Sequence, residues 1–256
     1  MVGTGGANAV TVSTMSTRLA SLVIDATDPA AAAQFWYIML GGTATPEPGG
    51  GHRLLAPDVG GSGIDLVFTP AAGRKTGKNR IHLDLATESP HEYQVLTSLA
   101  EDVGARAADV GQGPQVPWTV FHDPEGNEFC ILEPGDLYQR TGPLAALVVD
   151  CADPAALAGF WSAATGWPQV HAEPGSAALR SSATSGPWLE FLRVPDPKRG
   201  PNRLRFDVTA DRCPTDLAHL LDLGASPVPG SADHGVAWLA DPEGNEFRLV
   251  PAHVRT

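Results

Sequence analysis

The chain contains two copies of one sequence, and this duplication limits the folds that it can adopt. The nine residues from Asp123 to Ile131 read DPEGNEFCI, and those from Asp241 to Leu249 read DPEGNEFRL, 118 positions later. Copies of about 120 residues are longer than a solenoid unit of about 20–50 residues, and they have the size of a domain. We therefore expect two domain-sized repeats that share one fold.

Further segments repeat in the same order, at an offset that falls from 125 at the start of the copies to 118 at their end. They are Leu22–Ala30 with Leu147–Ala155, Asn79–Asp84 with Asn202–Asp207, and Asp102–Ala105 with Asp222–Ala225. The drift indicates short deletions in the second copy, in loops that tolerate changes of length. These matches predict a first domain over residues 18–134, a linker over 135–143 and a second domain over 144–256.

Residues 1–17 are rich in Gly, Thr, Ser and Ala. They lack the basic start and the continuous apolar core of a signal peptide, so we expect a disordered tail in which Met15 offers an alternative start.

Charge, hydropathy and cysteine content argue against nucleic-acid binding, a membrane span and a disulfide framework. The net charge is −12, which argues against nucleic acid and anionic membranes as partners. No apolar run reaches the length of about 18 residues that a membrane span requires. The three cysteines, Cys130, Cys151 and Cys213, have no paired spacing and predict no disulfide framework. We expect a cytoplasmic monomer or homodimer.

Each repeat is predicted to contain a strand, a helix and three strands, twice over. Alternation of apolar residues and turn signals predict the strands, and Asp28-Pro29 and Ser89-Pro90 predict the helix starts. In the first repeat the expected strands cover residues 19–25, 52–56, 64–69, 81–86, 118–122 and 128–133. The expected helices run from residue 28 to near residue 41 and from 90 to 103, and the second repeat follows the same plan.

This element order, with the DPEGN turn, resembles the vicinal oxygen chelate superfamily, which includes glyoxalase I, extradiol dioxygenases and bleomycin resistance proteins. The wording Asn-Arg-Ile-His-Leu-Asp at 79–84 and Glu-Gly-Asn-Glu-Phe-Cys at 125–130 is most similar to its actinobacterial glyoxalase-like branch. The resemblance implies an α+β fold of two tandem glyoxalase-like domains. Each would be a pair of βαβββ modules that form a curled, cup-shaped mixed sheet.

Strand alternation places the candidate site residues of the first repeat. Along residues 80–85, Arg80, His82 and Asp84 share the face opposite the apolar residues. Glu128 and Cys130 share a face of a later strand. These side chains are expected to line the inside of the cup.

The resemblance also implies where a metal would be bound. Metal-dependent members take one ligand from each of three strands, and the corresponding positions here are Ser21, His82 and Cys130. In the second repeat they are Ala146, Arg205 and Arg248, of which Ala has no donor atom and the guanidinium groups have no free lone pair. The second repeat is therefore expected to hold no metal.

The first repeat leaves two interpretations open. His82 and Cys130 are ligands for a soft divalent ion, with Glu128 in place of the poor ligand Ser21. Alternatively, Cys130 is a small buried residue and His82 a hydrogen-bonding wall of the cavity. We expect no cofactor, while a divalent metal in the first domain remains open.

The arginines Arg203, Arg205 and Arg248 are expected to point into the second cup, where buried cations need anions. Either acidic residues (Glu246, Asp207 and Glu190) or an anionic ligand would neutralise them. Two basic loops, Arg74–Lys78 and Lys198–Arg199, are either solvated or the rim of an anion site. The expected ligand-binding residues are Ser21, Arg80, His82, Asp84, Trp118, Glu128, Cys130, Arg205 and Arg248.

Two functions follow from these observations. The first is a metal-independent small-molecule binding protein that resembles the bleomycin-type drug-sequestering proteins. The second is a glyoxalase- or dioxygenase-like lyase, isomerase or oxidoreductase, with its site in the first domain around His82. The sequence does not name the ligand.

Overall fold

The computed structural model describes residues 17–57, 63–71, 73–111, 113, 115–182, 184–233 and 235–252. The predicted tail at residues 1–16, with Met15, lies outside this part of the chain. Thr17, which the sequence placed in the tail, is buried and is the first residue of a strand. No helix among the described residues is long and apolar enough to cross a membrane.

The first repeat contains two βαβββ modules, as the sequence predicted. Module 1 comprises β1 (Thr17–Ala26), α1 (Pro29–Leu40), β2 (Thr43–Pro46), β3 (His52–Leu55) and β4 (Asp65–Pro70). Module 2 comprises β5 (Ile81–Leu85), α2 (Pro90–Asp102), β6 (Arg106–Ala107), β7 (Trp118–His122) and β8 (Glu128–Leu132). Strands β2 and β6 are too short to give a clear alternating pattern, and they were not located in the sequence.

The second repeat follows the same plan. Module 3 comprises β9 (Leu144–Cys151), α3 (Pro154–Thr165), β10 (Gln169–Glu173), β11 (Ser176–Arg180) and β12 (Trp188–Arg193). Module 4 comprises β13 (Leu204–Ala210), α4 (Cys213–Asp222), β14 (Ser226–Asp233), β15 (Val236–Ala240) and β16 (Glu246–Pro251).

The first helix of each repeat begins at an Asp-Pro pair. The Asp28 carboxylate accepts a hydrogen bond from the Ala31 amide, and Asp153 accepts one from Ala156. The proline that follows each Asp has no amide proton, so its place at the first helical position leaves no donor unsatisfied. These starts are as predicted.

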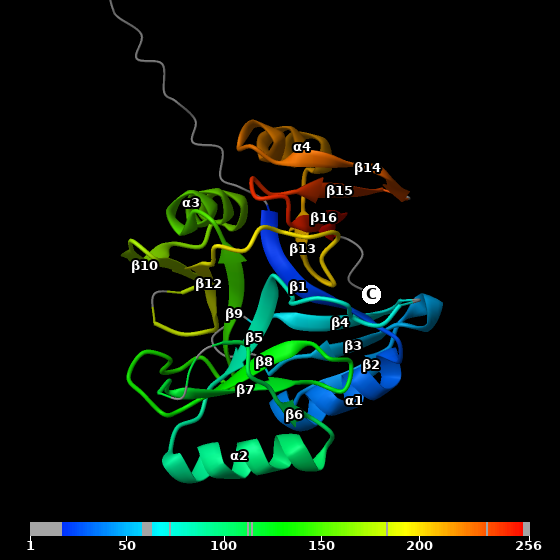
Figure 1. Ribbon diagram of the computed structural model, residues 1–256. Coiled ribbons are helices and arrows are strands. Elements are labelled where there is room, and N and C mark those ends of the chain that lie inside the picture. The colour runs from blue at the N-terminus through cyan, green and yellow to red at the C-terminus, as the bar shows by residue number, and fades with distance from the viewer. Residues whose placement is uncertain are drawn as a thin grey trace, which may run out of the picture.

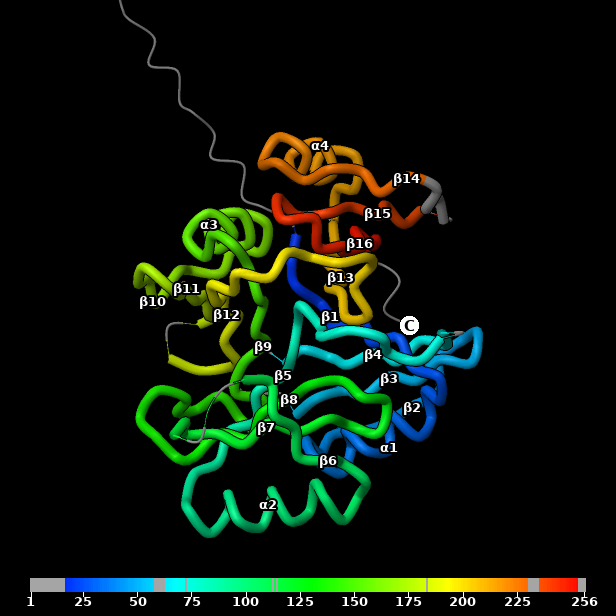
Figure 2. The backbone as a smooth tube through the Cα atoms, in the orientation of Figure 1, coloured from blue at the N-terminus to red at the C-terminus, as the bar shows by residue number. Residues whose placement is uncertain are grey.

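The four modules combine into two eight-stranded mixed sheets, and each sheet takes one module from each repeat. Sheet A joins modules 1 and 4, because β1 pairs antiparallel with β13. Sheet B joins modules 2 and 3, because β5 pairs antiparallel with β9. Figure 2 shows blue β1 beside yellow β13, although they are far apart in the chain.

The α+β class and the paired βαβββ modules are therefore confirmed, but the two modules of one repeat do not share a sheet. Apolar alternation sets which face of a strand is buried, and it does not specify which strand edge will be its partner. The prediction that both modules of one repeat share a sheet rested on their order in the chain, and it was wrong for this reason.

One hydrophobic core connects the two sheets. Helix α1 packs on sheet A and meets sheet B, where the rings of Trp36 and Phe129 lie 5.2 Å apart. Helix α3 packs on sheet B and meets sheet A, where Trp161 and Phe206 lie 5.1 Å apart. Helices α2 and α4 lie at the two outer ends of the molecule (Figure 1). Each sheet has one face that is packed against helices and one that is not. The face without helices is called the inner face below.

Candidate functional site

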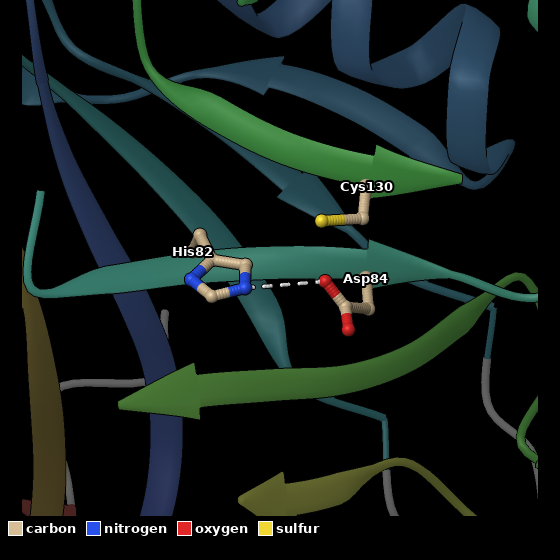
Figure 3. Close-up of side chains that lie close together, drawn as sticks. All are labelled: His82, Asp84 and Cys130. Carbon is tan, nitrogen blue, oxygen red and sulfur yellow. Dashed lines mark ion pairs between the residues drawn. The ribbon is translucent and has the colours of Figure 1, made fainter. Parts of the chain in front are cut away.

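The inner face of sheet B carries a cluster of titratable side chains. His82 and Asp84 extend from β5 and Cys130 from the adjacent β8, where Asp84 and Cys130 are partners in register. The His82 Nε2 atom lies 3.4 Å from Asp84 Oδ1. Figure 3 shows the Cys130 sulfur pointing toward the gap between the other two side chains. The alternation predicted from the sequence places all three on one face.

These three residues form the one group in the described part of the chain whose donor atoms are arranged as metal ligands are. One nitrogen, one oxygen and one sulfur atom all lie within 4.8 Å of one another. Asp84 Oδ1 is buried and receives no well-aligned hydrogen bond, although His82 Nε2 lies 3.4 Å away. A buried acceptor without a donor is costly unless a cation or a proton satisfies it.

The buried acids in this cluster resist ionisation. Burial raises the pKa of Asp84, and His82 and the Cys130 thiol offset this only in part. Burial and the Asp84 carboxylate raise the pKa of the Cys130 thiol far above its usual range. The site is therefore short of positive charge and favours either bound protons or a cation.

A further acid, Glu190 on β12, belongs to the same face. Burial and the neighbouring Asp84 raise the pKa of Glu190 to about 7. The Tyr138 hydroxyl lies within hydrogen-bonding reach of Glu190, and burial together with Glu190 raises the pKa of Tyr138. Glu190 was expected to neutralise arginines of the second repeat. It lies instead beside Asp84 of the first, because β12 belongs to sheet B.

Strand β9 forms the floor between the two sides of the site. Val148 of β9 is in register with His82 on one side and with Glu190 on the other. Two strand spacings separate these residues, so their Cα atoms lie about 10 Å apart. Ala146, the neighbouring floor residue, is small and fully buried. This arrangement places one titratable group on each side of β9.

The inter-repeat linker closes one side of this face. Tyr138 contacts Trp188 edge to face, with ring centroids 5.9 Å apart, and it packs against both apolar clusters of the inner face. Arg180 holds the linker by donating to the Gln139 carbonyl oxygen at 2.8 Å. The same guanidinium donates to Gly186 and lies over the Trp188 ring.

The inner face of sheet A is neutralised by internal ion pairs. Arg248 donates two hydrogen bonds to Asp207, at 2.7 and 2.6 Å. Arg205 donates to Asp25 at 2.7 Å. Both guanidinium groups lie over the ring of Trp238, at 5.2 and 5.7 Å from its centroid. Of the acids named from the sequence only Asp207 pairs with these arginines, because Glu246 binds Lys198.

Several predicted site residues lie away from the His82 cluster. Ser21 is on β1 of sheet A, where its hydroxyl is 3.5 Å from Asp207. Arg80 binds Glu243 and the Asp196 carbonyl oxygen. Glu128 binds Lys75 and the Asn79 amide, so it is not one of the clustered donors. Arg203 binds Glu125 rather than the inner face of sheet A.

Because each sheet takes one module from each repeat, the metal-ligand positions implied by the family resemblance are grouped by sheet and not by repeat. Sheet B brings together His82, Cys130 and Ala146, whereas sheet A brings together Ser21, Arg205 and Arg248. Asp84, two residues after His82, supplies the third donor that Ala146 lacks. Trp118 of β7 packs beside Cys130 at the edge of the same face.

Glu190 and Tyr138 were not placed in this site by the sequence. A signal for Glu190 was present, since it is the one charged residue inside the apolar run Trp188–Leu192. Tyr138 is the one aromatic residue of a polar linker. Neither signal shows that these residues meet His82, because that depends on the pairing of β9 with β5.

Comparisons with known proteins agree with this fold. A family model described as a glyoxalase-like domain matches residues 21–132 and again residues 146–250. No curated protein sequence matches the chain.

Among solved structures, glyoxalase I from Zea mays is similar over 92% of each chain, with 17% identity and a TM-score of 0.64. A V278E mutant of the same enzyme matches over 93% of each chain, with 15% identity and a TM-score of 0.64. A glyoxalase/bleomycin resistance protein/dioxygenase family enzyme from Burkholderia phytofirmans PsJN matches 42% of this chain and 96% of its own, with 17% identity and a TM-score of 0.32. The two matches to the family model cover most of the sequence, and the chain therefore belongs to the glyoxalase-like domain family of the vicinal oxygen chelate superfamily.

Proposed function

We propose that this protein binds a small organic molecule on the inner face of sheet B and transfers protons to and from it, as a lyase or isomerase. One observation carries the proposal. His82, Asp84, Cys130 and Glu190 come from three strands and both repeats, and they converge on one buried face. Clusters of titratable groups with shifted pKa values are concentrated at active sites.

The proposed chemistry uses the two sides of the β9 floor. His82 and Glu190 flank Val148, so a molecule lying on β9 contacts a nitrogen base on one side and a carboxyl group on the other. One group removes a proton from carbon while the other donates a proton to oxygen, which is the requirement of enolisation or elimination. Asp84 orients His82, and Tyr138 limits the entry of water from the linker side.

A divalent cation fits the same residues. His82, Asp84 and Cys130 would hold it, since they offer the nitrogen, oxygen and sulfur donors that zinc-like ions accept. When bound, such an ion would polarise a substrate oxygen and lower the cost of charge developing there.

Hydrogen exchange tests the proposed proton transfer without knowledge of the product. Small α-hydroxy and α-keto carbonyl compounds are incubated with the protein in D₂O, and deuterium incorporation at carbon is followed by NMR. We expect exchange that falls by about 10²–10⁴-fold in His82→Ala and in Glu190→Gln. Arg18→Ala, an exposed position on β1 of sheet A, is the control and retains exchange. Equal exchange in wild type and His82→Ala would contradict the proposal.

Metal analysis of the purified protein tests the cation separately. We expect about one divalent ion per chain, lost in His82→Ala and in Asp84→Asn. Exchange that persists after complete chelation would assign the chemistry to the side chains alone.

Metal-independent binding of a drug or metabolite is the second candidate. The aromatic rings of Trp188, Tyr138 and Trp118 and the small residues of β9 favour it, because they give the same face a largely apolar surface. A thermal-shift screen of aromatic natural products tests it, since a ligand at 100 times its Kd stabilises by about 2.7 kcal/mol. A hit that protects without deuterium exchange would favour this candidate over the enzyme.

A further inference from the structure

We propose that a second site, in the groove between the two loops that precede β5 and β13, binds a small anion that carries two or more phosphate groups. The groove has a volume of about 580 Å³. One wall is formed by residues 74–80 of the first repeat and the other by residues 194–203 of the second, with Asp150 between them. None of the residues of the His82 cluster lines it, so this proposal is independent of the proposed function.

Positive charge is concentrated in this groove. The chain has 17 Lys and Arg against 29 Asp and Glu. The lining nevertheless contains six cationic residues and only two acidic ones, Asp150 and Asp196. The six are Arg74, Lys75, Lys78, Arg80, Arg199 and Arg203. In a protein of net charge −12, such a local excess attracts anions to one place.

Two of the arginines fix the walls in place. Arg80 donates to the Asp196 carbonyl oxygen of the opposite loop at 2.6 Å, and Arg203 donates to the Gly73 carbonyl oxygen at 2.7 Å. Arg80 also pairs with Glu243, and Arg203 with Glu125. Each loop is thus tied to the other by a guanidinium, and the groove is formed before a ligand arrives. A preformed site loses less conformational entropy on binding.

Two other arginines remain available to a ligand. Arg74 and Arg199 are exposed, one on each loop, and neither has an ion-pair partner among the described residues. Lys75 and Lys78 are committed to Glu128 and Asp150, although the Lys78 side chain is 45% exposed. The free guanidinium groups therefore stand at the two sides of the groove.

This arrangement favours a ligand with more than one phosphate. A guanidinium binds phosphate through two parallel hydrogen bonds, which a carboxylate-paired lysine does not offer. An anion that reaches both loops engages Arg74 and Arg199 together, whereas a single small anion engages one. The net charge of −12 disfavours a large polyanion such as nucleic acid, which would extend beyond the groove.

Titration calorimetry of the full chain with inorganic pyrophosphate tests the site. We expect one binding site per chain, and a Kd weakened by at least about tenfold in the double variant Arg74→Ala/Arg199→Ala. Both side chains are exposed, so this variant should fold, and circular dichroism checks it. The single variant Arg199→Ala should lie between wild type and the double variant.

A matched control separates a specific site from general charge attraction. Arg18→Ala/Arg212→Ala removes the same charge from the sheet A end of the molecule, where these side chains pair with Asp211 and Asp216. We expect its Kd for pyrophosphate to remain within twofold of wild type. Absence of binding at millimolar pyrophosphate would overturn the proposal. So would a Kd unchanged by the groove variant, or one equally weakened by the control.

Discussion

Glu190 shows how one buried carboxyl group couples the site to the stability of the whole protein. Burial and Asp84 raise its pKa from 4.5 to about 7, so the folded protein retains a proton that the unfolded chain releases. The contribution of Glu190 to the free energy of unfolding is therefore most favourable below pH 4.5. It falls as the pH rises from about 4.5 to about 7 and changes little from this group above that range.

Replacement of this carboxyl group should remove that pH dependence. In metal-free protein, Glu190→Gln is expected to flatten the stability profile between pH 4.5 and about 7. Above that range it should stabilise the protein by up to about 3 kcal/mol, since each unit of pKa shift corresponds to about 1.4 kcal/mol. Urea unfolding across the range measures this effect. The exposed Glu88→Gln is the control, and an unaltered slope in Glu190→Gln would contradict the assignment.

At the scale of elements, the repeated DPEGN turn is a connection between the sheets. Asp123 accepts a hydrogen bond from the indole of Trp36 at 3.2 Å and also from the Glu125 and Asn127 amides. Glu125 accepts from the amides of Thr27 and Asp28, at the start of α1. The turn belongs to sheet B and α1 packs on sheet A, so this one phrase joins the two layers.

Loss of the Glu125 charge should weaken that connection. Burial alone would raise the pKa of Glu125, but hydrogen bonds from Thr27 and Asp28, together with Arg203, lower it. Its contribution is therefore present above the ordinary Glu pKa of 4.5 and is lost as the pH falls through the lowered value.

We expect Glu125→Gln to destabilise the protein by about 1–3 kcal/mol at neutral pH, because an amide oxygen replaces a charged acceptor. The effect should shrink in acid. Glu243→Gln, at the equivalent position, should cost a similar amount, since Glu243 binds the amides of Ala152 and Asp153. Urea unfolding measures both variants. An exposed control, Glu101→Gln, should change stability by less than about 0.5 kcal/mol.

The sequence was sufficient to locate most elements and to orient their side chains. The period of two put His82, Asp84 and Cys130 on one face, because successive strand residues point to opposite sides. The Asp-Pro pairs located the starts of α1 and α3. Contacts across the sheets lay beyond such local signals. That Glu190 meets Asp84 follows from a pairing between β5 and β9, strands that lie in different repeats.

At the scale of the whole molecule, neither repeat contains a complete sheet. Strand β1 pairs with β4 and β13, and β5 pairs with β8 and β9, so a single repeat leaves one edge of β1 and one edge of β5 unpaired. Unpaired strand edges of this kind lead to pairing with another chain.

Residues 17–134 produced alone are therefore expected to form a homodimer. In it, β1 of one copy would pair with β5 of the other, as β1 pairs with β13 in the full chain. Light scattering with size-exclusion chromatography measures the mass, and circular dichroism checks the fold. A folded, stable monomer would show that the two modules of one repeat complete a sheet by themselves.

The sharing of modules between the two sheets affects how the sequences of the two repeats can diverge. In an assembly of two identical single-repeat chains, every substitution would appear on the inner faces of both sheets at once. In the fused chain, His82 and Arg205 occupy corresponding positions but are different residues. His82 lies beside the Asp84 carboxyl group, whereas Arg205 forms an ion pair with Asp25. Covalent linkage of the copies thus allows one inner face to be filled by ion pairs while the other carries the His82 cluster, on two sheets built from the same modules.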